Sequence, residues 1–113
     1  MKNYVQEGDY VEVTLPYDRL SGQGVLVGAA IFGVCVVDGL TGASINIHTE
    51  GVYDLTAATG ASTDAVVGAK AYWDNTNRRI TPVSTSNTYV GVFLAAKATT
   101  DAVARVRLNE FVI

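Results

Sequence analysis

The stretch from residue 68 to residue 82 constrains the fold of this chain more than any other. A β-forming run ends in the only tryptophan, Trp73, the polar residues 74–77 follow, and a second β-forming run occupies residues 79–81. Two such runs joined by a short polar segment are typical of a β-hairpin whose loop is longer than two residues. Pro82 cannot donate a backbone hydrogen bond, so the second strand is expected at a sheet edge.

Short alternating runs between glycine-rich turns extend this β pattern over the rest of the chain. In residues 10–15 apolar and polar side chains alternate, which predicts a strand with one buried and one exposed face. Residues 103–108 alternate in the same way. Residues 43–55 form the longest alternating run, and Gly51 within it indicates a bulge or a close approach of another backbone.

The run at residues 89–96 makes a specific prediction about strand faces. Its alternation sets Val90 and Val92 on one face and Phe93 on the other. Gly91 is expected to leave room there for an aromatic ring from a neighbouring strand.

Two segments are apolar almost without interruption, residues 25–27 and residues 31–37. Continuous apolarity of this kind indicates a strand that is buried on both faces. We expect one face to pack on the core and the other on a partner subunit. Residues 56–59 are small and polar, and we expect one helical turn there within a loop.

Together these segments predict an all-β protein, a compact sandwich or barrel of about seven to nine short, mostly antiparallel strands. A length of 113 residues fits a single β domain over residues 1–113, with residues 1–8 as an extended N-terminal arm. The sequence shows no linker, no low-complexity tract and no strong internal repeat.

The composition of the chain bears on its partners. Hydrophobic residues make up 49% of it and charged residues only 17%, which indicates that neighbouring molecules cover part of the surface. A net charge of −3 argues against nucleic-acid binding, which needs a cationic surface. The basic residues cluster only at Arg78 and Arg79 and at Arg105 and Arg107, and we interpret the latter two, on one face of a strand, as solvated. The longest apolar stretch, residues 24–37, is too short and glycine-broken to span a bilayer as a helix, so no membrane partner is expected.

No residue pattern in the chain is typical of catalysis, so we predict no enzyme activity and no catalytic, cofactor-binding or metal-binding residue. The single cysteine, Cys35, lies in an apolar run and is expected to be a buried, inert thiol. His48 and Glu50 are the one pair that a proton shuttle could use, but we favour a hydrogen-bonded imidazole that is exposed or faces a subunit. Residues 74–77 carry oxygens but lack the spaced acids of a calcium-binding EF-hand loop.

Six segments carry a resemblance that spans nearly the whole chain. In order they are NYVQEG at 3–8, SGQGVLVG at 21–28, FGV at 32–34, EGVYDL at 50–55, VGAKAYWD at 67–74 and RVRL at 105–108. The ordered set resembles the phage capsid cement or decoration proteins, small head proteins of tailed phages that were once classed as a domain of unknown function. Ala69 departs from the pattern, because family members often have a more acidic residue at this step.

The resemblance implies a compact β fold, homotrimers and binding to the major capsid protein on the outer face of a capsid. We therefore predict a structural virion protein on the capsid surface, made in the host cytoplasm, that stabilises the mature shell. The N-terminal arm is expected to add as a strand to a capsid or neighbour edge, and the apolar C-terminal tail to dock on a core or a subunit. The candidate capsid or subunit contacts are Asn3, Tyr4, Val5, Gln6, Phe111, Val112 and Ile113.

An alternative function is a carbohydrate- or ligand-binding β module on the virion surface. Aromatic side chains on a β face can stack against sugar rings. This alternative predicts an exposed cluster of Tyr53, Tyr72, Trp73 and Tyr89, whereas the favoured interpretation places these rings in the core or at a subunit interface.

Overall fold

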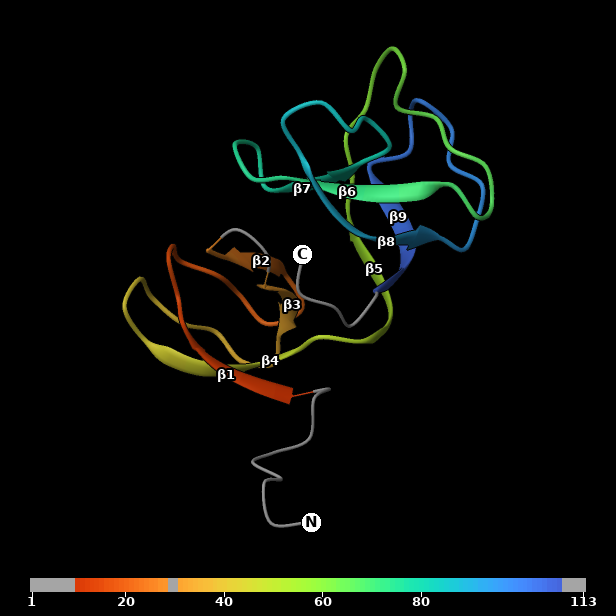
Figure 1. Cartoon of the computed structure of the whole chain (residues 1–113). Helices are drawn as coiled ribbons and strands as arrows, with labels where there is room; N and C mark the ends of the chain where they lie inside the picture. Colours follow the sequence, from red (N-terminus) through yellow and green to blue (C-terminus); the bar gives the residue numbers. More distant parts are fainter. Residues whose placement is uncertain (1–9, 29–30, 109–113) are drawn as a thin grey trace.

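The structure is a computed structural model that describes residues 10–28 and 31–108 (Figure 1). The described residues form nine strands and no helix, which confirms the predicted all-β fold. Within each of the two sheets every strand pairing is antiparallel. The first sheet has the order β1-β4-β3-β2, with β1 (Tyr10–Thr14), β2 (Gly24–Val27), β3 (Ile31–Cys35) and β4 (Ser44–His48). The second has the order β5-β9-β8-β6-β7, with β5 (Gly51–Thr56), β6 (Lys70–Asp74), β7 (Arg79–Thr81), β8 (Thr88–Phe93) and β9 (Val103–Leu108).

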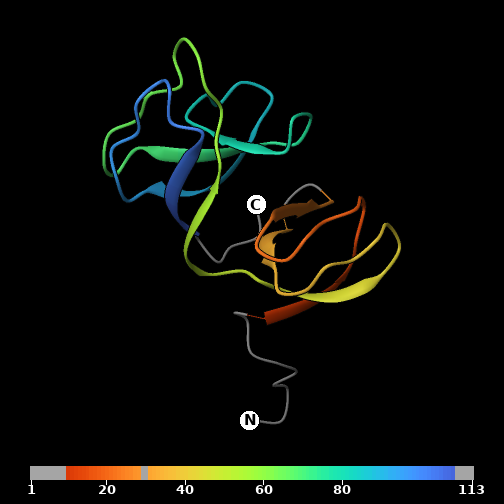
Figure 2. The ribbon, with the colours of Figure 1, turned by 180° about the vertical axis from the view of Figure 1, so that it is seen from behind.

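The two sheets form two lobes that lie side by side (Figures 1 and 2). We call residues 10–28 and 31–49, with β1 to β4, the first lobe, and residues 50–108, with β5 to β9, the second lobe. The chain passes from one lobe to the other between β4 and β5.

The first lobe follows its predicted alternation. In β1 the side chain of Val13 is buried while Glu12 and Thr14 are exposed, as expected for a strand with one face on a core. Strands β2 and β3 are buried on both faces along most of their length, as predicted, but the run predicted to be buried to residue 37 ends at Cys35, and Val36 and Val37 are exposed. The inner faces of β2 and β3 lie in a minor core with β1 and β4, whose members are Val13, Leu15, Tyr17, Val25, Cys35, Ile45 and Ile47.

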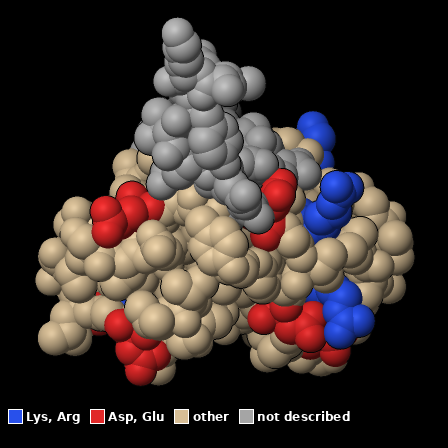
Figure 3. Space-filling view, turned by 90° about the horizontal axis from the view of Figure 1, so that it is seen from below, with Lys and Arg blue, Asp and Glu red and all other residues tan. Residues whose placement is uncertain are grey.

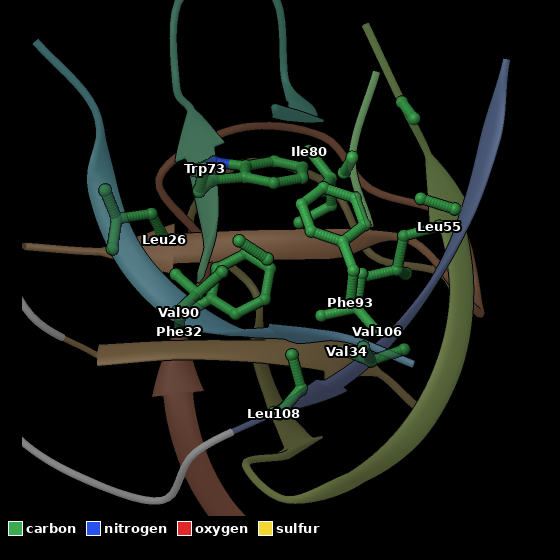
Figure 4. Packing of buried hydrophobic residues seen from close by; sticks show 14 residues of the cluster. Leu26, Phe32, Val34, Leu55, Trp73, Ile80, Val90, Phe93, Val106 and Leu108 are labelled. Carbon is green, nitrogen blue, oxygen red and sulfur yellow. The ribbon is translucent and has the colours of Figure 1, made fainter. Parts of the chain in front are cut away.

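The opposite faces of β2 and β3 pack on the second lobe, so the expectation that a partner subunit covers one face is wrong. Leu26, Phe32 and Val34 join a shared core with second-lobe residues (Figure 4). The ring of Phe32 lies 4.9 Å, centroid to centroid, from the ring of Trp73. Because this chain supplies the cover for both faces, the apolar runs of β2 and β3 do not require a second copy.

The long alternating run at residues 43–55 is not one strand. Strand β4 ends at His48, and β5 begins at Gly51 in the other sheet. Gly51 has φ of +115°, a backbone conformation that side-chain-bearing residues rarely adopt, and it marks the crossing between the lobes. Alternate residues of this run face inward on both sides of the crossing, but they reach different cores. Ile47 lies in the minor core and Leu55 in the shared core.

The predicted hairpin in the second lobe is confirmed. Strands β6 and β7 pair with Trp73 opposite Ile80 and Asp74 opposite Arg79, and β7 lies at the end of the sheet order. A parallel bridge between Ala57 and Ile80 then links the two ends of this sheet, so the second lobe closes into a small barrel. This closure removes the expected helical turn at residues 56–59, because Ala57 N–H donates to Ala102 O and Ala58 N–H to Ile80 O instead.

The predicted strand faces of residues 89–96 are wrong at one position. The β6–β8 pairing shifts register, with Ala71 opposite Gly91 but Tyr72 opposite Tyr89, so Val90 is an extra residue in a β-bulge. Since a bulge reverses the alternation, Val90 and Phe93 both point into the shared core. No ring packs at Gly91, where an added Cβ would instead collide with the backbone oxygen of Arg107.

Candidate contact surfaces

The candidate contacts at the two chain ends lie outside the described residues. This applies to Asn3, Tyr4, Val5 and Gln6 in the N-terminal arm and to Phe111, Val112 and Ile113 in the tail. Their contacts remain predictions.

The aromatic side chains do not form the exposed cluster that the alternative function requires. Trp73 is only 2% exposed and lies in the shared core (Figure 4). Tyr72 and Tyr89 form a half-buried pair with ring centroids 5.7 Å apart. Tyr53 contacts His48 instead, so the four rings do not meet on one surface. The cluster prediction is wrong for Trp73.

His48 belongs to a hydrogen-bonded junction where the chain changes sheets. Its Nδ1 lies 2.7 Å from the Tyr53 hydroxyl, and that hydroxyl donates to the backbone carbonyl of Glu50 at 3.0 Å. The single hydroxyl proton is therefore used, which makes His48 Nδ1 the donor in the first bond. The ring also packs edge-on against Tyr10, 4.1 Å between centroids. This network holds the imidazole in place and uses the Glu50 backbone.

Asp74 organises the hairpin loop. Its carboxylate accepts hydrogen bonds from the N–H groups of Thr76 and Asn77 and from the Asn77 side chain, at 2.9 to 3.2 Å. Partial burial alone would raise the pKa of the Asp74 carboxyl, but these hydrogen bonds and the charge of Arg79 outweigh it and hold the pKa below its usual range. Its oxygens thus serve N–H donors, and no group of three metal-ligating side chains forms among residues 10–28 and 31–108.

Three of the four clustered arginines have partners within the chain. Arg105 donates bidentate hydrogen bonds from Nε and Nη2 to the Asp54 carboxylate, at 3.0 and 3.2 Å, and these bonds lower the pKa of Asp54. Arg79 lies 3.4 Å from Asp74. The Arg78 guanidinium lies 3.9 Å from the centroid of the Tyr17 ring. Within the described residues, Arg107 has no carboxylate within 4.0 Å.

Tyr17 links the two lobes, a role that no pattern in the sequence indicated. Its hydroxyl donates to Asn75 Oδ1 at 2.9 Å and accepts from the Leu26 N–H of β2 at 3.0 Å. Asn75 Oδ1 also accepts from Trp73 Nε1 at 3.1 Å. One hydroxyl thereby joins the hairpin loop of the second lobe to the outer strand of the first sheet.

Two turns of the first lobe lie against each other and cap each other. The turns occupy residues 20–23 and 40–43. The residues directly before them, Arg19 and Gly39, pair in an antiparallel β-bridge. Asp18 Oδ1 accepts from the N–H and hydroxyl of Thr41 at 2.7 and 2.8 Å. Asp38 Oδ1 accepts from the Ser21 N–H at 2.7 Å. The hydrogen bonds that Thr41 donates lower the pKa of the Asp18 carboxyl, and the bond from the Thr41 backbone N–H has the larger effect.

The second lobe contains an equivalent pair of turns. They occupy residues 66–69 and 98–101, close with the same hydrogen bond between first and fourth residue, and are joined by a bridge between Ala65 and Lys97. Here the clamp is the ammonium of Lys97, which is 4% exposed and donates to Ala98 O in one of these turns and to Thr63 O in the neighbouring turn at residues 60–63, both at 3.0 Å. The two lobes thus share a local arrangement of turns that was not predicted from the sequence.

Large apolar side chains are exposed on the turn pairs. Leu20 is 59% exposed and Leu40 71% exposed, and both line an open hollow of about 460 Å³ with Asp18 and Asp38. We call these four residues the turn patch. Exposed apolar side chains that share a hollow are typical of a protein–protein contact.

Among the described residues, none lies in a helix long and apolar enough to cross a membrane. The fold and its surfaces define a small all-β protein that offers apolar turns for contact with other molecules. A family model described as phage cement protein matches residues 5–108 of the 113, so the chain belongs to the phage cement protein family. No curated protein and no solved structure matches the chain.

Family membership confirms the resemblance and gives the protein a coarse role. It is a structural, capsid-stabilising protein of the phage virion, associated with the capsid. The family is a structural one, which favours a role without catalysis.

Proposed function

We propose that this protein binds the outer surface of a phage capsid, contacts the major capsid protein there as a homotrimer, and stabilises the mature shell. The observation that carries the proposal is the family match over residues 5–108. We further propose that the protein is made in the host cytoplasm and joins heads after their shell has formed.

The proposed mechanism combines weak contacts. Once one subunit of a trimer is bound, the other subunits bind at high effective concentration, so overall affinity is large even where each contact is weak. A protein that binds the mature lattice but not its precursor stabilises the mature form by mass action. Stabilisation of the shell then requires no chemical step.

We propose that the two chain ends supply contacts to the capsid or to a neighbouring subunit. Residues Asn3 to Gln6 would add as a strand to an exposed sheet edge, where backbone hydrogen bonds supply affinity. The apolar residues Phe111, Val112 and Ile113 would pack on the same partner. Strand β1 begins at Tyr10, directly after the arm, so an arm held by a partner would be continuous with the first sheet.

Sedimentation with heads that lack this protein tests the proposal. The full chain is expected to sediment with mature heads and to protect them against heat-induced loss of DNA. Deletion of residues 2–7 should abolish sedimentation with heads while leaving the circular dichroism spectrum unchanged, and deletion of residues 111–113 tests the tail separately. Full binding by the chain that lacks residues 2–7 would refute the proposed arm contact. A full chain that ignores mature heads would refute the proposed function.

The outer location has a separate test. Antibodies against the folded protein should label intact virions, because a protein on the outer surface is accessible without opening the shell. Labelling only after disruption of the particle would place the protein inside. Burial of Trp73 argues against the carbohydrate-binding alternative, because a buried ring cannot stack against a sugar.

A further inference from the structure

Charge is divided unequally between the lobes. The first lobe carries Arg19 as its one cationic side chain against Glu12, Asp18 and Asp38 in the described residues. The second lobe carries six cationic residues, which are Lys70, Arg78, Arg79, Lys97, Arg105 and Arg107. Figure 3 shows blue side chains gathered on one half of the face that it displays, whereas red side chains lie on both halves. The second lobe also carries five carboxylates, those of Glu50, Asp54, Asp64, Asp74 and Asp101. Among the described residues the first lobe is therefore net negative and the second lobe slightly net positive.

The turn patch concentrates the features of the first lobe. Leu20 and Leu40 are exposed beside the Asp18 and Asp38 carboxylates. Each carboxylate uses Oδ1 to cap the opposite turn. A carboxylate has about four acceptor positions on its two oxygens, so each can still accept from a cationic partner. Arg19 lines the same hollow, so the turn patch combines apolar surface with two carboxylates beside one cation.

A complementary surface crosses the barrel of the second lobe. Val52 pairs with Arg107, Arg107 with Val92, and Val92 with Lys70, so these four residues lie in one row across β5, β9, β8 and β6. Residues paired across neighbouring strands share a sheet face, and this row is on the outer face. We call it the barrel row. Val52 is 51% exposed, and in the described part of the chain neither Lys70 nor Arg107 has a carboxylate within 4.0 Å.

The two surfaces belong to different lobes, the turn patch to the first and the barrel row to the second. The loop around residue 40 lies at the end of the first lobe that points away from the second (Figures 1 and 2). Two different surfaces that match in apolar character and oppose in charge suit a head-to-tail contact between identical chains. A contact of this kind repeats from copy to copy and closes into a ring when the rotation allows.

We propose that the turn patch of one copy docks on the barrel row of a second copy, with Leu20 and Leu40 against Val52 and Val92 and with Asp18 and Asp38 facing Lys70 and Arg107. This inference deepens the self-association within the proposed function and rests on it. Opposed charges of this type speed association and exclude wrong partners, and their effect falls as salt is added.

Charge reversal tests the contact from both sides. Arg107→Glu should weaken self-association at least about tenfold, because it places like charges opposite each other, and light scattering should then report the 11.9 kDa mass of one chain. Leu40→Lys should have the same effect from the turn patch, because it places a positive charge against Lys70 and Arg107. Arg107→Lys keeps the charge and should assemble. Thr85→Glu adds a negative charge on an exposed turn outside both surfaces and should also assemble.

Mixing the two defective variants separates this contact from other geometries. The Arg107→Glu chain keeps its turn patch and the Leu40→Lys chain keeps its barrel row, so a mixture should form dimers through one intact contact, although each variant alone is monomeric. A two-fold symmetric contact between like surfaces would not be restored by mixing. All three substituted residues are exposed, so the circular dichroism spectrum of each variant should match that of the wild-type chain.

Each remaining outcome decides the inference. Self-association by Arg107→Glu and Leu40→Lys at wild-type strength would overturn it, and if both also lost head binding, these surfaces would face the capsid instead. A monomeric wild-type chain that still binds heads would overturn the inference and leave the proposed function in place. A wild-type chain that neither self-associates nor binds heads would overturn both.

Discussion

The two lobes hold their turns in place in different ways. In the first lobe, two exposed carboxylates, Asp18 and Asp38, each cap the opposite turn from outside. In the second lobe, one buried ammonium, that of Lys97, binds two backbone carbonyls from inside. An exposed clamp is open to solvent and protons, whereas a buried clamp is part of the packing, so the lobes should differ in how they respond to mutation and to pH.

Loss of Trp73 should have the largest effect, because it removes the core that both lobes share. Trp73→Ala is expected to destabilise the protein by about 3–5 kcal/mol, measured by urea unfolding followed with circular dichroism. Trp73→Phe, which keeps a ring against Phe32, should cost less. In the wild-type chain, Trp73 fluorescence and circular dichroism should report one coincident transition, in line with our proposal of a single domain. Two separated transitions would show that the lobes unfold independently.

Loss of the buried clamp should have the next largest effect. Lys97→Met keeps most of the side-chain volume but leaves Thr63 O and Ala98 O without their donors, which is expected to cost about 1–3 kcal/mol. Urea unfolding measures this change, and Lys70→Met serves as a control because Lys70 is exposed on the barrel. Equal stability of the two variants would contradict a structural role for Lys97.

Loss of an exposed clamp should have a smaller effect that depends on pH. Because the folded-state pKa of Asp18 lies below its ordinary value of 3.8, this carboxylate stabilises the fold above that value, and its contribution is lost as the pH falls through the folded-state pKa. Asp18→Asn should therefore lower the melting temperature at neutral pH and flatten its decline in acid. A decline as steep as that of the wild-type chain would argue against this cap as an acid-sensitive element.

The smallest perturbation comes from labelling Cys35, because the rate at which its thiol reacts reports on opening of the first lobe in the wild-type chain. Burial raises the pKa of the Cys35 thiol, so little reactive thiolate forms in the folded protein. Labelling by a thiol reagent should be slow in buffer and fast in urea. If labelling rises at urea concentrations where Trp73 fluorescence is still native, the first lobe opens before the second.

The sequence predicted those parts of the fold that depend on local patterns. Alternation identified the inward faces of β1 and β9, and the polar residues after Trp73 identified the β6–β7 hairpin. It missed the crossing at Gly51, because the parity of residues continues unchanged from one sheet to the other. It also missed the bulge at Val90, since a run of apolar residues reads the same with or without an extra residue.

The contact surfaces were harder to predict than the strands. Asp18 caps a turn 23 residues away, and Tyr17 bonds to a residue 58 positions away. Interactions over such separations leave no periodic signal in a single sequence. Leu20 and Leu40 do occur in similar Leu-Ser-Gly and Leu-Thr-Gly turns, a likeness that could have indicated the paired turns.

The hydrogen bond from Leu26 to the Tyr17 hydroxyl bears on how β2, at the end of its sheet, behaves when many copies of the protein are packed closely together. A strand at the end of a sheet exposes unpaired N–H groups, and dense packing of identical molecules invites such edges to join into fibres. The Leu26 N–H of β2 already donates to Tyr17 inside its own chain. Many copies side by side on one shell would thus find this amide occupied, which favours an ordered coat over aggregation.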